Sequence, residues 1–183
     1  MKKIITSGII AIALAFVSLV SFSSSTYAQT VTKTEQEERC SLAQTNLSAL
    51  ITDVTATKTV HSDVYTGIKT KIDTIITTAK SAGYDTADLA AASTKIQTAM
   101  TQYEAKSTAY TTSLTTTKNL DCDESDTALT AGIVKNRADL VSVRTSTLAV
   151  RTVIKNDAIT ALKDYAAWLA LKAGTSTEEG TEQ

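Results

Sequence analysis

Apolar positions recur at helical spacing in three long segments of the chain between residues 34 and 173. The first segment opens with Thr34 and Glu37, whose spacing is that of a capping box, and this predicts a helix beginning at residue 34. The helix is predicted to end at Ala82, because Gly83 can adopt the left-handed conformation that follows a helix. Its apolar stripe consists of Leu47, Leu50, Val54, Val64, Ile68, Ile75 and Ala79.

A second helix is predicted to start directly after that glycine. With Asp85 as the N-cap, Asp88 occupies the N3 position, and Tyr84 and Leu89 stand where a hydrophobic staple packs. Five threonines between Thr111 and Thr117 weaken the helical signal toward the end of this segment. The apolar stripe comprises Leu89, Ile96, Tyr103 and Tyr110 at seven-residue steps, with Met100 and Leu114 beside it.

A third helix is predicted from Asp123 or Ser125 to Ala173, and Gly174 is expected to end it. Its central stripe contains Ile133, Leu140, Ile154, Ala161 and Trp168. One flank adds Val134, Val141, Leu148, Leu162 and Leu169, and the other adds Val143 and Val150. Such a wide apolar face requires two neighbouring helices.

Short connections between long helices force antiparallel neighbours. The pattern therefore predicts an elongated all-α fold: a three-helix antiparallel bundle, or a coiled-coil-like hairpin with a third long helix. The first and third helices would each be about 70 Å long and the second about 50 Å. The last turns of the third helix, around Tyr165, Trp168 and Leu171, should then extend beyond the corner at Gly83 and meet a partner or a second copy.

The ends of the chain carry different signals. Residues 1–28 combine Lys2 and Lys3 with an apolar run and small residues up to Ala28, which is the layout of a secretory signal peptide. An uncleaved membrane anchor is the alternative, although the apolar run is short for a bilayer. Residues 29–33 are expected to be a linker, 34–173 the bundle domain, and 174–183 a disordered acidic tail.

Composition excludes several classes of function. Removal of residues 1–28 leaves 155 residues with 16 basic and 19 acidic side chains, and a net charge of −3 gives no reason to expect a nucleic-acid partner. The chain has no proline, which suits long uninterrupted helices better than an enzyme fold rich in turns. It also carries no phosphate-binding loop, nucleophile elbow or zinc motif, so neither catalysis nor a cofactor is expected.

Cys40 lies in the first turns of the first helix, and Cys122 lies just beyond the second. Folding the hairpin about residues 83 to 85 brings the two cysteines toward the same end, and Cys122 stands in a connection that can reach its partner. Two cysteines in an exported chain predict one structural disulfide. The absence of a CxxC motif argues against redox or metal chemistry.

Two further residue groups invite a functional interpretation. His61 is the single histidine and falls on the first apolar stripe, so a core or rim position is expected in preference to a pH-sensing contact. The acidic cluster Asp121–Asp126 resembles the opening of a calcium loop, but Asp126 replaces the required glycine and Gly132 stands in place of the bidentate glutamate. Acidic residues at the positive N-terminus of a helix explain the cluster without a metal.

Arg137, Arg144 and Arg151 repeat every seven residues along the third helix and form one basic stripe. This stripe could bind an anionic partner, or it could flank the bundle and pair with aspartates of the first helix, such as Asp53, Asp63 or Asp73. The stripe and the residues Tyr165, Trp168 and Leu171 together form the candidate interaction surface.

The functional prediction is a structural or partner-binding protein of the cell envelope, exported to the periplasm or beyond the cell. It would act through helix-packing surfaces that meet another copy or another protein. A holdase-type chaperone is the alternative, because the layout resembles in outline that of exported helical-hairpin proteins, including periplasmic holdase chaperones. Contact with a membrane is expected only through an uncleaved signal segment.

Overall fold

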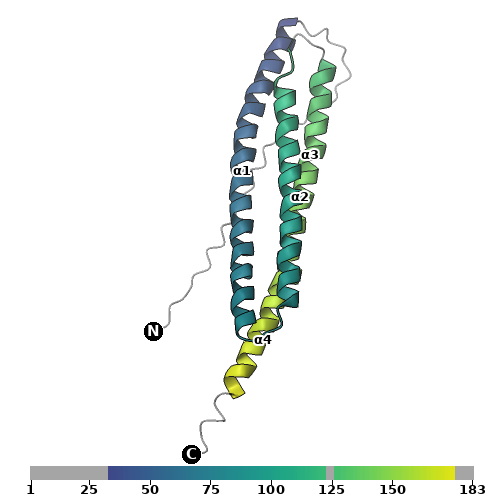
Figure 1. The fold of residues 1–183 in the computed structure, drawn as a ribbon. Helices are drawn as coiled ribbons and strands as arrows, with labels where there is room; N and C mark the ends of the chain where they lie inside the picture. Colours follow the sequence, from purple (N-terminus) through teal and green to yellow (C-terminus); the bar gives the residue numbers. More distant parts are fainter. Residues whose placement is uncertain (1–32, 123–125, 176–183) are drawn as a thin grey trace, which may run out of the picture. The chain divides into compact units, whose positions relative to one another are not determined.

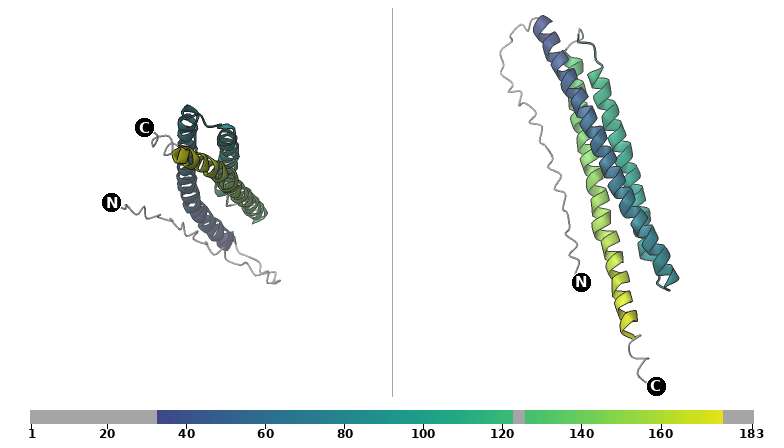
Figure 2. Two further views of the ribbon diagram at one scale, coloured as in Figure 1. Left: turned by 90° about the horizontal axis from the view of Figure 1, so that it is seen from below. Right: turned by 90° about the vertical axis from the view of Figure 1, so that its left-hand side faces the viewer.

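The fold was obtained as a computed structural model that describes residues 33–122 and 126–175, and every regular element in these two stretches is helical. Helix α1 spans Lys33–Ser81, α2 spans Ala87–Lys118 and α3 spans Asp126–Val153. A π-helical segment, η1 (Ile154–Ala158), joins α3 to α4 (Ile159–Thr175) without a break. Helices α1 and α3 each pack antiparallel along α2 (Figures 1 and 2). The predicted all-α, antiparallel three-helix architecture is confirmed.

The corner between α1 and α2 forms where the sequence places it. Gly83 has φ of 85°, a left-handed conformation that glycine adopts without steric cost, and the N–H of Tyr84 donates to Ala79 O at 3.0 Å. Capping of α2 differs by one position from the expectation. The first helical residue is Ala87, its N–H donates to Asp85 Oδ1 at 3.0 Å, and Thr86 at the N-cap makes no side-chain bond.

The C-terminal helix runs past its predicted end. Gly174 and Thr175 are still helical, so Gly174 does not terminate the helix as expected. Glycine in a helix costs only about 1 kcal/mol relative to alanine, which the bonds of neighbouring turns can offset.

The core is centred on α2, whose predicted stripe is fully confirmed. Its buried side chains include Leu89, Ile96, Met100, Tyr103, Tyr110 and Leu114. One cluster joins Ile96, Met100 and Tyr103 of α2 to the following residues of its neighbours: Tyr65 and Ile72 of α1, Val150 of α3 and Ala158 of η1. A second cluster near the Gly83 corner joins Ala79, Leu89 and Ala161.

The apolar stripe assigned to α1 is wrong at one position. Val64 is 52% exposed, whereas its neighbour Tyr65 is buried against Tyr103 with the two rings edge to face. Tyr65, Ile72 and Ala79 follow one another at seven-residue steps and face the core. Adjacent residues on an α-helix point about 100° apart, so only one of the two side chains can face α2.

The π segment was not anticipated from the sequence. The N–H of Ile159 donates to Ile154 O, five residues earlier, which widens this turn of the helix. Val150 and Ala158 are both buried in the same cluster although they lie eight residues apart. In an uninterrupted α-helix that separation would turn the two side chains about 80° away from each other. The wider turn brings both onto the side that faces α2.

Threonine, a weak helix former, is accommodated in these helices by bonds to their own backbone. Exposed threonine hydroxyls donate to the carbonyl four residues earlier, as Thr55 does to Ile51 O at 2.7 Å and Thr115 to Thr111 O at 2.9 Å. Each hydroxyl is thereby satisfied without a partner on another helix. The threonine-rich stretch 111–117 stays helical throughout.

A buried polar contact joins α2 to α3. Ser113 Oγ donates to Asn136 Oδ1 at 2.7 Å, and Asn136 Nδ2 donates to Thr117 Oγ1 at 3.1 Å. All three side chains are buried. Because buried polar groups are costly unless they are paired, this contact favours one alignment of the two helices over its neighbours.

Candidate interaction surface and disulfide

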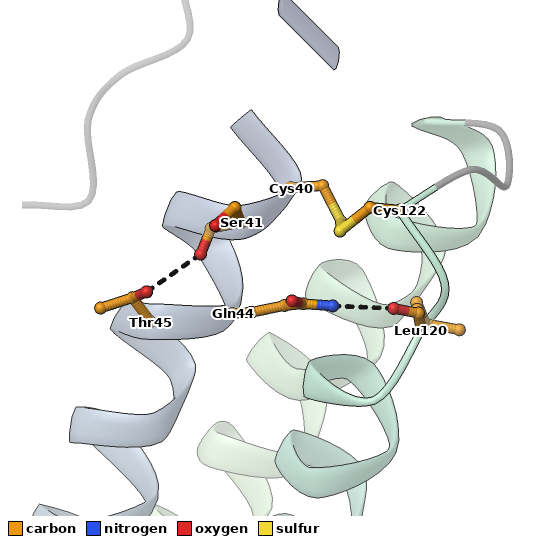
Figure 3. The surroundings of a disulfide bond; sticks show 6 residues. All are labelled: Cys40, Ser41, Gln44, Thr45, Leu120 and Cys122. Atoms are coloured by element: carbon orange, nitrogen blue, oxygen red, sulfur yellow. Dashed lines mark hydrogen bonds between the residues drawn. A yellow bond between two sulfur atoms is a disulfide. The ribbon is translucent and has the colours of Figure 1, made fainter. Parts of the chain in front are cut away.

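The two cysteines form the predicted disulfide. Cys40 on α1 and Cys122 beyond the end of α2 are bonded, with 5.5 Å between their Cα atoms and a separation of 82 positions in sequence (Figure 3). One turn further along α1, Gln44 Nε2 donates to Leu120 O at 2.8 Å. The disulfide and this bond close the end of the α1–α2 hairpin that lies opposite the Gly83 corner.

The outer face of α3 carries an exposed apolar stripe. Val134, Val141 and Leu148 are 60%, 59% and 60% exposed and follow one another at seven-residue steps. The opposite side of the helix, with Val150, is buried. The sequence predicted that both flanks of this wide apolar face would find neighbours, and the structure corrects this: along α3 the bundle covers one flank only, although Leu162 of the other flank packs against the core in α4.

Beside the apolar stripe lie Arg137, Arg144 and Arg151, all exposed. Within the described parts of the chain none of the three has a carboxylate within ion-pairing distance. The expected pairing with aspartates of α1 is therefore not found. Both α1 and α3 pack along α2 and approach each other less closely, and Asp73 is instead paired with Lys69 at 2.7 Å. That bond and one from Ser93 lower the pKa of Asp73 below its usual value.

The outer face of α1 was not recognised from the sequence. Leu42, Val60 and Val64 are 63%, 51% and 52% exposed on this helix. Asp53 and Asp63 are exposed on the same helix, and in the described residues neither has a basic partner within 4 Å. The signal that could have revealed this face is the run of small and acidic residues between its widely spaced apolar ones.

The aromatic residues of α4 pack against the corner as the helix passes it. The ring of Tyr84 lies 5.0 Å from that of Tyr165 and 5.3 Å from that of Trp168, measured between centroids. Lys172 Nζ lies 4.7 Å from the Trp168 ring and donates to Ala82 O at 2.8 Å. The extension of α4 past the corner is visible in Figure 1, where only its last turns project. Of the predicted surface residues at this end, Leu171 is the most exposed, at 73%.

His61 lies at the rim of the core, as expected. Its Nδ1 is 3.2 Å from the Tyr103 hydroxyl oxygen, and its ring packs against the rings of Tyr65 and Tyr103. Partial burial, and secondarily the positive charge of Arg151, lower the pKa of His61 below its usual value. Burial also raises the pKa of Tyr103. The neutral imidazole is thus the form that this site favours, which suits a packing role.

Half of the acidic cluster at 121–126 lies outside the described residues, because Asp123, Glu124 and Ser125 belong to the gap between the two stretches. Within the described residues no three acidic, histidine or cysteine side chains are grouped closely enough to hold a metal ion. The predicted signal peptide, linker and acidic tail also fall outside, apart from Lys33, Gly174 and Thr175. None of the helices in the described part has a stretch long and apolar enough to cross a bilayer.

The chain matches no protein-family model, no curated protein and no solved structure.

Proposed function

We propose that this chain is an exported, disulfide-stapled helical protein that acts by presenting a helix-packing surface to a protein partner. One observation carries the proposal: the stripe of Val134, Val141 and Leu148 on the outer face of α3, each about three-fifths exposed. Apolar side chains aligned at heptad spacing form the seam by which one helix packs on another. Within a single copy of the described bundle this seam has no partner.

The energetics favour occupation of the seam. Complete burial of a valine or leucine side chain is worth about 1.5–3 kcal/mol, so covering the remaining exposed area of each would contribute roughly 1 kcal/mol. The bundle can present the seam without losing order, because the disulfide and the buried Asn136 contact hold the helices in place. A preorganised surface loses less conformational entropy when a partner binds.

Support for export comes from the disulfide. Such bonds persist in oxidising compartments and are rare in reducing ones. The signal-peptide layout of residues 1–28 and the Cys40–Cys122 bond therefore both favour a location outside the cytosol. Cell-envelope location is part of the proposal on these two grounds.

The test is site-specific photo-crosslinking in living cells that export the protein. A photoreactive residue at Val141 should give an adduct of defined mass, whereas one at Gln97, which is exposed on α2 away from the seam, should give none. Equal adduct yields at the two positions would show that contact with the seam is not specific, and no adduct at either would show that the seam is simply hydrated.

A holdase-type chaperone would use the same seam differently. Exposed apolar residues also occur on α1 and α4, including Leu42 and Leu169. A holdase predicts many adducts of different mass at Val141 and equally many at Leu42. A single adduct confined to the α3 seam argues for a specific partner instead.

A further inference from the structure

We propose that the partner is a second copy of this chain, with the outer face of α1 in one copy packed in parallel against the outer face of α3 in the other. This inference rests on the proposed function and names its partner. The α1 face is defined by Ala49, Asp53, Ala56, Val60 and Asp63, and the α3 face by Val134, Arg137, Val141, Arg144, Leu148 and Arg151.

The two faces are complementary in charge. Three exposed arginines on the α3 face have no carboxylate partner among the described residues, and two exposed aspartates on the α1 face have no basic partner there. One face is therefore basic and the other acidic, in a chain whose other surface charges are mixed. Pairing α3 with α3, or α1 with α1, would set like charges against each other, which is unfavourable across an interface.

The contacts within the bundle show which residues of α1 and α3 lie at the same level. His61 and Asp73 of α1 bond Tyr103 and Ser93 of α2. On the other flank of α2, Ser113 is hydrogen-bonded to Asn136 of α3, and Lys95 forms an ion pair with Asp157 of η1. Together these bonds place each α1 residue level with the α3 residue about 85 positions later, and both helices run in the same direction.

That alignment matches the two valines of the α3 face to small residues, whereas Leu148 lies at the level of Asp63. Ala49 lies at the level of Val134, and Ala56 lies at the level of Val141. Two copies standing side by side in parallel would therefore set the exposed valines of one α3 against the alanines of the other copy's α1. Large residues facing small ones allow two helices to interdigitate closely.

The same alignment matches the charges. Asp53 lies about level with Arg137, and Asp63 lies between the levels of Arg144 and Arg151. Toward the π segment the match ends, since Lys71 of α1 is level with the neighbourhood of Lys155, and both are basic and exposed. The interface accordingly covers the half of the bundle nearer the disulfide.

Charge reversal tests this pairing on the full exported protein with its disulfide formed. One variant carries Asp53→Arg and Asp63→Arg, another carries Arg137→Asp, Arg144→Asp and Arg151→Asp, and a third combines all five changes. The control reverses two exposed charges of α2, Glu104→Lys and Lys106→Glu, which belong to neither of the two faces. The measurement is mass by light scattering during size-exclusion chromatography over a range of concentrations.

Wild type and the control should show at least twice the mass of one chain, whether the contact closes into a pair or continues from copy to copy. The dissociation constant of each single-face variant should be at least about tenfold higher than that of the wild type. The combined variant should regain association, because both faces have exchanged sign. Its recovery also shows that these substitutions leave the bundle folded.

Three outcomes would overturn the inference: a wild-type protein that is monomeric at every concentration, single-face variants that associate like wild type, or a combined variant that stays dissociated. These are distinguishable from failure of the proposed function. A monomer whose Val141 probe still crosslinks to a different protein removes the second copy as partner and leaves the α3 seam in use.

Discussion

At the scale of single residues, two glycines of the helices have opposite surroundings. A Cβ added at Gly132 of α3 would lie 2.7 Å from both Oγ1 and Cγ2 of Thr117 and 3.1 Å from its Cβ. Rotation of the threonine cannot relieve this contact, because its Cβ does not move and its hydroxyl is bonded to Asn136 and Ser113. A Cβ added at Gly67 of α1 would meet no atom within 4 Å.

Alanine at these two positions should therefore act in opposite directions. Gly67→Ala is expected to raise the free energy of unfolding by about 0.5–1 kcal/mol, because glycine is the poorer helix former. Gly132→Ala is expected to lower it by about 1 kcal/mol or more, since α2 and α3 must separate to admit the methyl group. Denaturant titration followed by circular dichroism measures both, and similar stabilisation by the two changes would mean that the α2–α3 approach is not close at Gly132.

At the scale of the element, the π segment is the feature that joins two differently oriented parts of one helix. It holds one residue more than a regular turn requires, and Asn156 within it is exposed. Removing that residue allows the segment to become α-helical while Val150 before it and Ala161 after it keep their directions. Removing a residue from the regular part of α3 instead changes the direction of the side chains on one side of the deletion relative to those on the other.

Deletion of Asn156 should accordingly leave the thermal midpoint of unfolding close to that of the wild type. Deletion of Ala149, which is also exposed, should turn the residues on its two sides about 100° relative to each other and so expose part of the core. The expected loss in the second case is about 3 kcal/mol or more, comparable to truncation of a large core side chain. Equal losses from the two deletions would contradict this role for the π segment.

At the scale of the whole bundle, the α1–α2 hairpin is held at both ends, by the turn at Gly83 and by the Cys40–Cys122 bond. The bond closes a long loop, so the entropy that it removes from the unfolded chain is large. It also holds α1 beside α2 at the end of the bundle where the proposed acidic and basic faces lie.

Replacing both cysteines by alanine should lower the free energy of unfolding by about 4 kcal/mol on the chain-entropy estimate. The contact between Gln44 and Leu120 should remain, since it does not depend on the bond. Chemical unfolding of the oxidised protein, with and without reductant, provides the comparison. Reduced wild type should behave like the double variant, and a loss below about 1 kcal/mol would show that the bond adds little to a hairpin that already forms.

Much of this architecture could be predicted from the sequence because the signals are local. The heptad of Leu89, Ile96, Tyr103 and Tyr110 fixes the inward side of α2, which is flanked by helices on two sides and buries that stripe whatever their precise placement. Gly83 marks the corner through its own backbone preference. The disulfide followed from combining these two features with the positions of Cys40 and Cys122.

Errors arose where a helix has apolar residues on more than one side. Val64 and Tyr65 are adjacent and both apolar, and periodicity alone did not select the tyrosine that packs against Tyr103. On α3 the flanks of Val141 and Val150 look equivalent in the sequence, yet the bundle buries one and leaves the other exposed. The residues chosen for the candidate surface were the three arginines and the aromatic C-terminal end. They included neither the exposed valines of α3 nor the outer face of α1.

The amino-acid sequence by itself determined that this protein is built from long helices joined by a tight corner and one covalent bond, because spacing, capping and glycine placement act over a few residues. Which flank of each helix stays exposed was decided only by the tertiary structure. Helices α1 and α3 each have one close neighbour, α2, and their positions on it depend on every packed side chain along about 50 Å of contact. The acidic face of α1 and the basic face of α3 follow from that arrangement.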